Sequence, residues 1–254
     1  MTQLKLSNPF NAPIYHEESV VSTMISAREL SRKKEVPGTV ICSDFQEEGR
    51  GRLGRKWHTD RGQSLMFTIF LAYEKLSSIP KALSLRTGLA LSYALEDLFP
   101  KLAGKIKIKW PNDILLDAAK TAGILIETDG KNVFIGMGVN ILQKSFPLDL
   151  KSKATSLILH LDKVNEETKL LLLEKILFFL HKELLDASVS WEKAMPLRLY
   201  KYKEEVIFAP MGPDSAYTVK GIISGIGRDG ELLINREGKA NAEAFFSGEL
   251  RVYM

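Results

Sequence analysis

The chain has very little cysteine, with only Cys42 among its 254 residues. A single thiol excludes an intramolecular disulfide, so the fold depends on its hydrophobic core. Hydrophobic residues make up 45% of the sequence, which is enough for such a core in a chain of this length. The sequence does not open with a charged and then apolar leader, and we therefore expect a cytoplasmic protein.

Long apolar runs and metal-binding patterns are also missing. The most apolar stretch, from Leu170 to Leu185, is interrupted by charged residues and by a histidine, so it does not form a clean membrane span of about 20 residues. We read it as a core helix and expect no membrane partner. The four histidines lack the spacing of zinc ligands, so no metal centre is predicted from them.

Positive and negative charges are nearly balanced, because 35 basic and 31 acidic residues leave a net charge of +4. A net charge this small does not require nucleic acid as a partner. The exception is segment 49–57, GRGRLGRKW, which holds three arginines, a lysine and three glycines but no carboxylate. Glycines let a backbone approach a ligand, and guanidinium forks match carboxylate and phosphate oxygens. We expect a mobile anion-binding loop, with a nucleic-acid-binding basic patch as the alternative from another class.

Hydrophobic periodicity predicts alternating helices and strands over the first 200 residues. Helices are predicted at 19–34, 81–99, 166–186 and roughly 189–200, and strands at 39–45, 64–72, 105–110, 122–127 and 132–140. This pattern indicates an α+β fold with a mixed sheet covered by helices. Short β-rich runs with turn signals follow and predict a small β-barrel. We therefore expect two domains, 1–201 and 202–254.

A second group of polar residues, after the basic segment 49–57, follows the predicted strand that ends near Trp110. Pro111 ends the strand and places Asn112 and Asp113 directly after the strand end, where polar side chains commonly form ligand-binding sites. Lys120 follows shortly with a free ammonium group. Alone, these residues favour an ordinary turn and a solvated lysine. Together with the basic loop, they favour a site for an anionic ligand.

These motifs resemble those of the biotin-protein ligases, also called biotin-[acetyl-CoA-carboxylase] ligases. GRGRLGRKW resembles the biotin loop of that family, KWPNDI with Lys120 and AGIL at 122–125 a second signature, and IGMGVN at 135–140 a third. Ser22-Thr23 and Gln46 match polar positions of the family, whereas Met24 and Met66 depart from its pattern. Residues 225–234 and 247–250 resemble its C-terminal SH3-like barrel. The resemblance implies a class II synthetase-like catalytic domain before that barrel.

The resemblance also implies a reaction. Biotin is activated with ATP and Mg²⁺ to biotinyl-5′-AMP and is then transferred to one lysine of a biotin carboxyl carrier protein, of acetyl-CoA carboxylase or a related carboxylase. Lipoate- or octanoate-protein ligation is the alternative within the superfamily. Only about twenty residues precede Ser22, so the resemblance is to the monofunctional type without an N-terminal DNA-binding domain. No DNA partner is expected, and a homodimer is allowed.

Residue roles follow from the same resemblance. It implies catalytic roles for Lys120, Arg50, Arg52 and Asp113. It implies biotin contacts for Ser22, Thr23, Gln46, Gly49, Arg50, Gly51, Arg52, Lys120 and Gly123. It implies ATP or adenylate contacts for Arg52, Arg55, Trp57, Lys109, Asn112, Gly138 and Asn140. Three roles stay open for Asp113, namely binding Mg²⁺, orienting Lys120 or acting as a base on the acceptor lysine.

Overall fold

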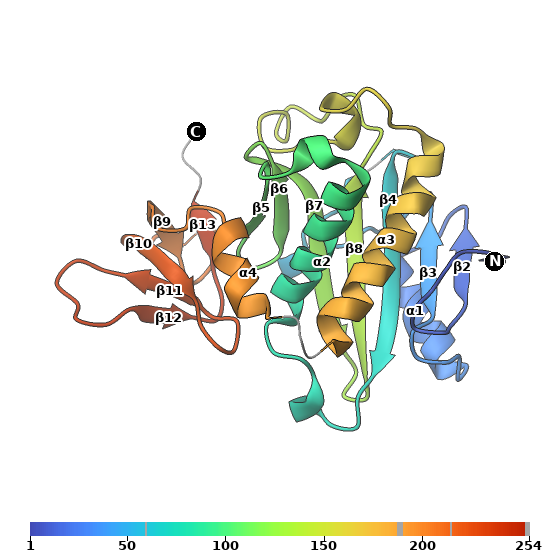
Figure 1. The fold of residues 1–254 in the computed structure, drawn as a ribbon, viewed down its shortest axis with the longest axis horizontal. Helices are drawn as coiled ribbons and strands as arrows, with labels where there is room; N and C mark the ends of the chain where they lie inside the picture. Colours follow the sequence, from blue (N-terminus) through green and yellow to red (C-terminus); the bar gives the residue numbers. More distant parts are fainter. Residues whose placement is uncertain (59, 187–189, 214, 252–254) are drawn as a thin grey trace.

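A computed structural model describes residues 1–58, 60–186, 190–213 and 215–251. Its larger part is an eight-stranded mixed sheet in the order β1-β2-β3-β4-β8-β7-β6-β5, in which β2 and β3 are parallel and the other neighbours antiparallel (Figure 1). The strands are β1 (Thr2–Leu4), β2 (Ile14–Glu17), β3 (Val40–Ser43), β4 (Ser64–Ala72), β5 (Ile106–Lys109), β6 (Asp113–Leu116), β7 (Ala119–Thr128) and β8 (Asn132–Asn140). The predicted α+β class is confirmed.

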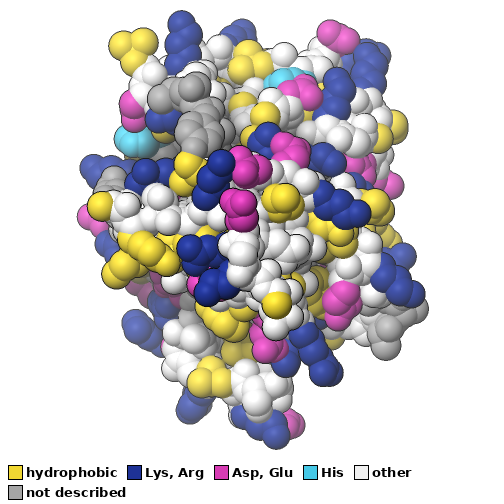
Figure 2. All heavy atoms as spheres, turned by 90° about the vertical axis from the view of Figure 1, so that its left-hand side faces the viewer, with side chains coloured by type: hydrophobic (Ala, Val, Ile, Leu, Met, Phe, Trp, Pro, Cys, Tyr) yellow, Lys and Arg dark blue, Asp and Glu magenta, His cyan; other side chains and the backbone are white. Residues whose placement is uncertain are grey.

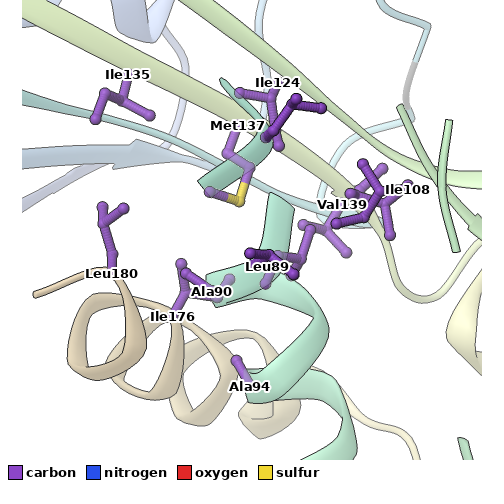
Figure 3. Close-up of a cluster of buried hydrophobic side chains, with 14 of the residues drawn as sticks. Leu89, Ala90, Ala94, Ile108, Ile124, Ile135, Met137, Val139, Ile176 and Leu180 are labelled. Carbon is purple, nitrogen blue, oxygen red and sulfur yellow. The ribbon is translucent and has the colours of Figure 1, made fainter. Parts of the chain in front are cut away.

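Helices cover both faces of this sheet. Helices α2 (Leu83–Leu98) and α3 (Glu166–Leu185) lie side by side on one face (Figure 1). The main core lies beneath them, where labelled side chains of both helices meet Ile124, Met137 and Val139 of the sheet (Figure 3). A smaller cluster on the other face joins α1 (Thr23–Arg32) to Phe70 and Phe134. Burial on both faces explains why β4 reads as one continuous apolar run.

The C-terminal part of the chain forms a second, five-stranded antiparallel sheet, preceded by α4 (Trp191–Arg198). Its strands are β9 (Glu205–Ala209), β10 (Val219–Ile226), β11 (Leu232–Asn235), β12 (Glu243–Phe245) and β13 (Glu249–Arg251). The indole of Trp110 packs edge-on against Phe208, with ring centroids 5.8 Å apart, and its Nε1 donates to the carbonyl of Gly230 at 2.9 Å. The two sheets therefore share a continuous core. Closure of the smaller sheet into a barrel stays a prediction, as does the domain boundary at 201.

Strands β2 and β6 of the large sheet were not predicted from the sequence, and neither were β12 and β13 of the smaller sheet. Strand β6 was missed because its turn to β7 uses Asp117 and Ala118, both with positive φ, rather than a glycine. Asp113 is consequently the first residue of a strand rather than part of an open loop.

Helix α1 begins at Thr23 instead of residue 19. The start of the helix expected at 189 and the last residues of the expected barrel, 252–254, lie outside the described residues. No described helix has the length and apolar character needed to cross a membrane.

Candidate functional site

One row of paired residues runs across six strands on the α1 face of the large sheet. Direct cross-strand partners point to the same face, so the pairing register defines this row. The row contains Ser43, Met66, Gly138, Gly123, Asp113 and Lys109, in the order β3-β4-β8-β7-β6-β5. Its two central members are glycines. The missing side chains of β8 and β7 leave a slot between Met66 and Asp113.

The indole of Trp57, the last residue of the basic loop, lies over this glycine slot. A Cβ on Gly138 would stand 2.6 Å from Trp57 Cε2, and a Cβ on Gly123 would stand 3.1 Å from Cζ3. Glycine is therefore required at position 138 for the ring to lie there, and a side chain at position 123 would press against the ring. The Nε1 of Trp57 is buried and has no hydrogen-bond acceptor within the described part of the chain. A ligand acceptor at this point would remove the cost of leaving that donor unpaired.

A hydrogen-bonded cluster closes the slot on the side of α1. The backbone N–H and the hydroxyl of Thr23 both donate to Gln46 Oε1, at 2.8 and 3.0 Å. Thr68 donates to the Thr23 hydroxyl at 3.0 Å, while Gln46 Nε2 donates to the sulfur of Met66 at 3.3 Å. The amide of Gln46 is thereby held in one orientation. This end of the slot offers fixed polar groups beside apolar surface.

An ammonium and a carboxylate lie at the opposite end. Lys120 Nζ is 2.6 Å from Asp113 Oδ1 and 5.6 Å from the centre of the Trp57 ring. A β-bulge is responsible for this placement, because Ile114 pairs with Ala122 while Leu115 pairs with Lys120. Without the extra residue, positions 120 and 123 would point to opposite faces of the sheet. The bulge brings Lys120 to the same face as the glycine slot.

Arg52 connects the basic loop to this end of the slot. Its guanidinium donates to Asn112 Oδ1 at 3.2 Å, and Asn112 Nδ2 donates in turn to the carbonyl of Ile124 at 2.9 Å. Burial lowers the pKa of Arg52, and the charge of Arg55 lowers it further, whereas Asp113 and Glu249 raise it. Arginine nevertheless remains protonated in proteins. The arrangement puts a permanent positive charge near Lys120.

Other basic side chains of the predicted site face carboxylates instead of the slot. Arg50 pairs with Glu48 at 2.9 Å, and both side chains are exposed. Arg55 pairs with Glu249 of the C-terminal sheet, and Lys109 Nζ is 3.9 Å from the same carboxylate. Any contact of these three groups with a ligand requires that they leave these partners.

The remaining predicted residues have structural contacts around the slot. Ser22 is the N-cap of α1, where its hydroxyl accepts from the N–H of Met24. Asn140 is buried at the slot end of β8 and donates to the carbonyl of Thr155 at 3.0 Å. Gly49 lies where a Cβ would be 2.9 Å from the carbonyl of Trp57, and Gly51 N–H donates to the carbonyl of Arg55 at 2.7 Å. Gly49 thus allows the loop to fold back on itself, and the hydrogen bond of Gly51 holds the loop in that shape.

Two residues next to the site were not identified from the sequence. Thr68 is fully buried and lies on the site face of β4, and its alternation with Met66 was the available signal. Glu249 belongs to the C-terminal sheet, and its approach to the basic loop has no local sequence signal. By contrast, burial and the charge of Asp44 raise the pKa of Cys42 to about 12, which disfavours the thiolate that a nucleophilic role would need.

The slot suits a flat ligand with a polar head and a carboxylate or phosphate tail. Fixed hydrogen-bonding groups lie at one end, an aromatic ring at the middle and cationic groups at the other. Small-molecule sites commonly combine apolar walls with a few placed polar groups in this way. No cluster of three histidine, cysteine or acidic side chains suited to a metal occurs among the described residues.

Comparisons with known proteins identify this part of the chain. Residues 18–141 match the profile of the biotin/lipoate A/B protein ligase family. The bifunctional ligase/repressor BirA of Bacillus subtilis is 37% identical over 153 residues, covering 57% of this chain and 45% of that protein. The biotin-[acetyl-CoA-carboxylase] ligase of Paracoccus denitrificans is 40% identical over 106 residues, covering 40% of this chain and 43% of that one. The matched regions span less than half the length of these relatives.

The fold agrees with the same family over nearly the whole chain. The biotin protein ligase of Aquifex aeolicus, solved in complex with biotin and ATP, superposes with a TM-score of 0.76 at 27% identity. The match covers 94% of this chain and 97% of the other. The matched residues 18–141 include the basic loop 49–57, the glycine slot and Lys120. Residues 18–141, which carry the slot, therefore match the biotin/lipoate A/B protein ligase family, and the whole fold is similar to that of a biotin protein ligase.

Proposed function

We propose that the protein is a biotin-protein ligase that joins biotin to ATP and transfers it to a carrier lysine. The observation that supports this most directly is Lys120, whose ammonium lies 2.6 Å from Asp113 and beside the Trp57 ring over the glycine slot. A cation at the end of a slot with a polar head site suits a ring compound that ends in a carboxylate. The relatives named for biotin ligation agree with this choice.

Biotin would lie along the slot with its ureido ring at the Thr23 and Gln46 end. The ureido group carries both donors and an acceptor, and Gln46 presents an amide fixed by Thr23 and Met66. Ser22, Gly49 and Gly51 would border this head group. The apolar ring and chain would lie against the Trp57 indole, which covers Gly123, with the carboxylate directed toward Lys120, Arg50 and Arg52.

The first half-reaction brings two anions together. A biotin carboxylate oxygen attacks the α-phosphorus, a new bond forms between them, and the bond to the β-phosphate oxygen breaks to release pyrophosphate. Lys120 and Arg52 would neutralise both reactants and stabilise the charge that develops on the transferring phosphoryl group. Mg²⁺ would be held mainly by the phosphates of ATP, with Asp113 as the carboxylate at that end of the slot.

The nucleotide would occupy the side of the site near Trp57. The adenine can stack on the indole, and Gly138 and Asn140 lie at the same end of β8. Lys109, Arg55 and Asn112 would contact its phosphates or ribose. The closed loop would keep water away from the reactive acyl phosphate until the acceptor arrives.

In the second half-reaction the amine of an acceptor lysine attacks the acyl carbon, AMP leaves, and the amine loses a proton. Asp113 is 2.6 Å from Lys120, which favours a role in orienting Lys120 among its three open roles. The acceptor would be a lysine of a biotin carboxyl carrier protein. We also propose that the unit 202–254 closes as a small SH3-like barrel beside a catalytic unit 1–201.

Two alternatives receive less support. Lipoate or octanoate lacks a ureido group, so the polar contacts of Gln46 and Thr23 would have no partner in the ligand. A nucleic-acid-binding role would favour a continuous basic stripe. Figure 2 instead shows Lys and Arg side chains scattered over the face that carries the C-terminal sheet, with acidic and apolar groups between them.

Incubation of the protein with biotin, ATP-Mg²⁺ and a biotin carrier domain tests this function. We expect biotin on one carrier lysine, measured by intact-mass spectrometry. The same assay with lipoate or octanoate and its own carrier domain should give no product. Acylation by octanoate but not biotin would replace the proposal with the alternative. Absence of any labelling of a carrier that a known biotin ligase modifies would refute it.

A further inference from the structure

The basic loop, residues 49–57, is attached to both sheets of the molecule. Arg52 donates to Asn112, which precedes β6 of the large sheet. Arg55 donates through both terminal nitrogens to Glu249, with Nη1 to Oε1 at 3.4 Å and Nη2 to Oε2 at 2.5 Å. Glu249 is the first residue of β13 in the C-terminal sheet. The Arg55 contact therefore joins segments that are 194 residues apart in the sequence.

Glu249 lies among several cations. Its side chain is only 26% exposed, and Lys109 Nζ is 3.9 Å from its Oε1. Burial raises the pKa of Glu249, but the hydrogen bonds from Arg55 and the charges of Lys109, Arg55 and Lys120 together outweigh burial and lower it. The carboxylate is therefore ionised at neutral pH. A paired carboxylate in such surroundings is a stronger anchor than an isolated pair on the surface.

Restraint at Arg55 reaches Trp57 through the backbone of the loop. The N–H of Gly51 donates to the carbonyl of Arg55 at 2.7 Å, and the N–H of Trp57 donates to the carbonyl of Gly49 at 2.9 Å. These bonds close the loop into a narrow hairpin. Holding Arg55 therefore also holds Trp57 over the glycine slot.

We propose that Glu249 is a positioning residue that latches Arg55 and so keeps the basic loop closed over the slot before a ligand binds. The importance of this latch for catalysis rests on the proposed function, since only then is the slot the place of adenylate formation. A bidentate contact with Glu249 and a contact with a phosphate compete for the same guanidinium. The C-terminal sheet thereby sets how readily Arg55 becomes available to the nucleotide.

Limited digestion of the full-length protein with trypsin, without ligands, tests the latch independently of activity. The variant Glu249→Gln keeps the size of the side chain and removes its charge. We expect cleavage after Arg50 and Arg52 to become about two- to fivefold faster, as for loss of a partly exposed ion pair. Fragments are quantified by mass spectrometry. Cleavage after Arg55 is not scored, because loss of the Glu249 contact changes the accessibility of Arg55 itself to trypsin.

The matched control is Glu243→Gln. It removes an Arg–Glu pair of the same sheet, in which Arg236 Nη1 is 2.9 Å from Glu243 Oε2, but it does not touch the loop. We expect no change in loop cleavage for this variant. The double variant Arg55→Gln/Glu249→Gln should cleave no faster than Arg55→Gln alone, because Glu249 acts on the loop through Arg55. A charge swap is a poor test, since an arginine at 249 would face Lys109.

Three results would overturn the latch: unchanged loop cleavage in Glu249→Gln, an equal rise in Glu243→Gln, or additive effects in the double variant. If Glu249→Gln does not fold, Glu249→Asp replaces it, because its shorter carboxylate does not span the bidentate contact. The two proposals fail separately. Wild-type protein that makes no adenylate refutes the proposed function, whereas an active enzyme with unchanged loop cleavage refutes the latch.

Discussion

The side chain of Lys120 is the residue on which the proposed chemistry most depends. It lies at the slot because a bulge turns it toward Gly123, and its ammonium has Asp113 as a fixed partner. In the proposed reaction, a lysine at this position would neutralise the carboxylate and the phosphate that must meet. Its flexible stem carries a compact ammonium charge, which can follow a reacting group more readily than a guanidinium.

Replacement of Lys120 by alanine is expected to lower adenylate formation by at least about 100-fold, the usual effect of removing one donor to a transition state. Pyrophosphate release in the presence of biotin and ATP-Mg²⁺ measures this rate. Lys101→Ala is the control, since Lys101 is exposed and pairs only loosely with Asp162, at 3.5 Å. Near-normal rates in Lys120→Ala would show that its role has been misassigned.

Substitution of Gly138 tests whether the glycine slot accommodates the indole. In Gly138→Ala the new Cβ would lie 2.6–2.9 Å from three rigid ring atoms of Trp57, so the ring must leave. We expect a red shift of tryptophan emission, because Trp110 and Trp191 stay buried and only the indole of Trp57 becomes more exposed to solvent. In the control Gly136→Ala, the Cβ would meet the flexible end of Met24 at 2.9 Å, which can move aside. Equal spectra for both variants would contradict the slot.

For single residues, the sequence identified most of the charged and polar side chains around the slot but not the residues with which they pair. The arginines of the loop were predicted as ligand contacts because of their type and spacing. The structure directs Arg50 to Glu48 and Arg55 to Glu249, a residue far away in sequence. Periodicity carries no information on such distant pairs. By contrast, Arg52 and Asn112 were both predicted in the nucleotide set, and the fold does bring them together.

Among the helices, α3 has the most complete N-terminal signal. Asn165 and Thr168 form a reciprocal capping box, and Glu166 and Glu167 occupy the first turn. Helix α4 differs, because its N-cap Ser190 makes no side-chain capping bond. This contrast gives a matched test of what the cap contributes.

We expect Asn165→Ala to destabilise the protein by about 1 kcal/mol and to lower its melting temperature by about 2–4 °C. Ser190→Ala should change the melting temperature little, because no capping bond is lost. Calorimetry of both variants against the wild type measures the difference. Equal shifts would show that the capping box of α3 does not stabilise the fold as described.

The elements were predicted unevenly. Strands β4 and β8 were predicted with their observed bounds, because both are long apolar runs between clear turn signals. Strand β6 was missed, since it has four residues and its turn lacks glycine. The bulge at Thr121 had no sequence signal either, although it decides the face on which Lys120 lies. Short strands and bulges depend on pairing with neighbours, which local sequence does not report.

Over the whole molecule, the two sheets meet through Trp110, which packs against Phe208 and donates to Gly230. Both contact partners lie in the C-terminal sheet or its turns. The buried apolar side chains of the two parts form one continuous cluster. Separation of the parts would expose this shared surface to water.

We therefore expect a single unfolding transition, with far-UV circular dichroism and tryptophan fluorescence giving the same midpoint in urea. Trp110→Ala should weaken the whole protein by about 3–5 kcal/mol, as for other large core truncations. Two separated transitions in the wild type would show that the sheets fold independently. In that case the contact at Trp110 would be an interface between autonomous units.

The sequence by itself determined the class of fold and most of the residues that the structure places around the slot. Glycine-rich motifs, basic residues and apolar runs are local patterns, and local chemistry restricts what they can form. Only the tertiary structure decided that Trp57 lies over Gly123 and Gly138, and that Glu249 holds Arg55. Those contacts depend on strand register, on a bulge and on the packing of two sheets. Each is set by interactions between segments that no single stretch of sequence contains.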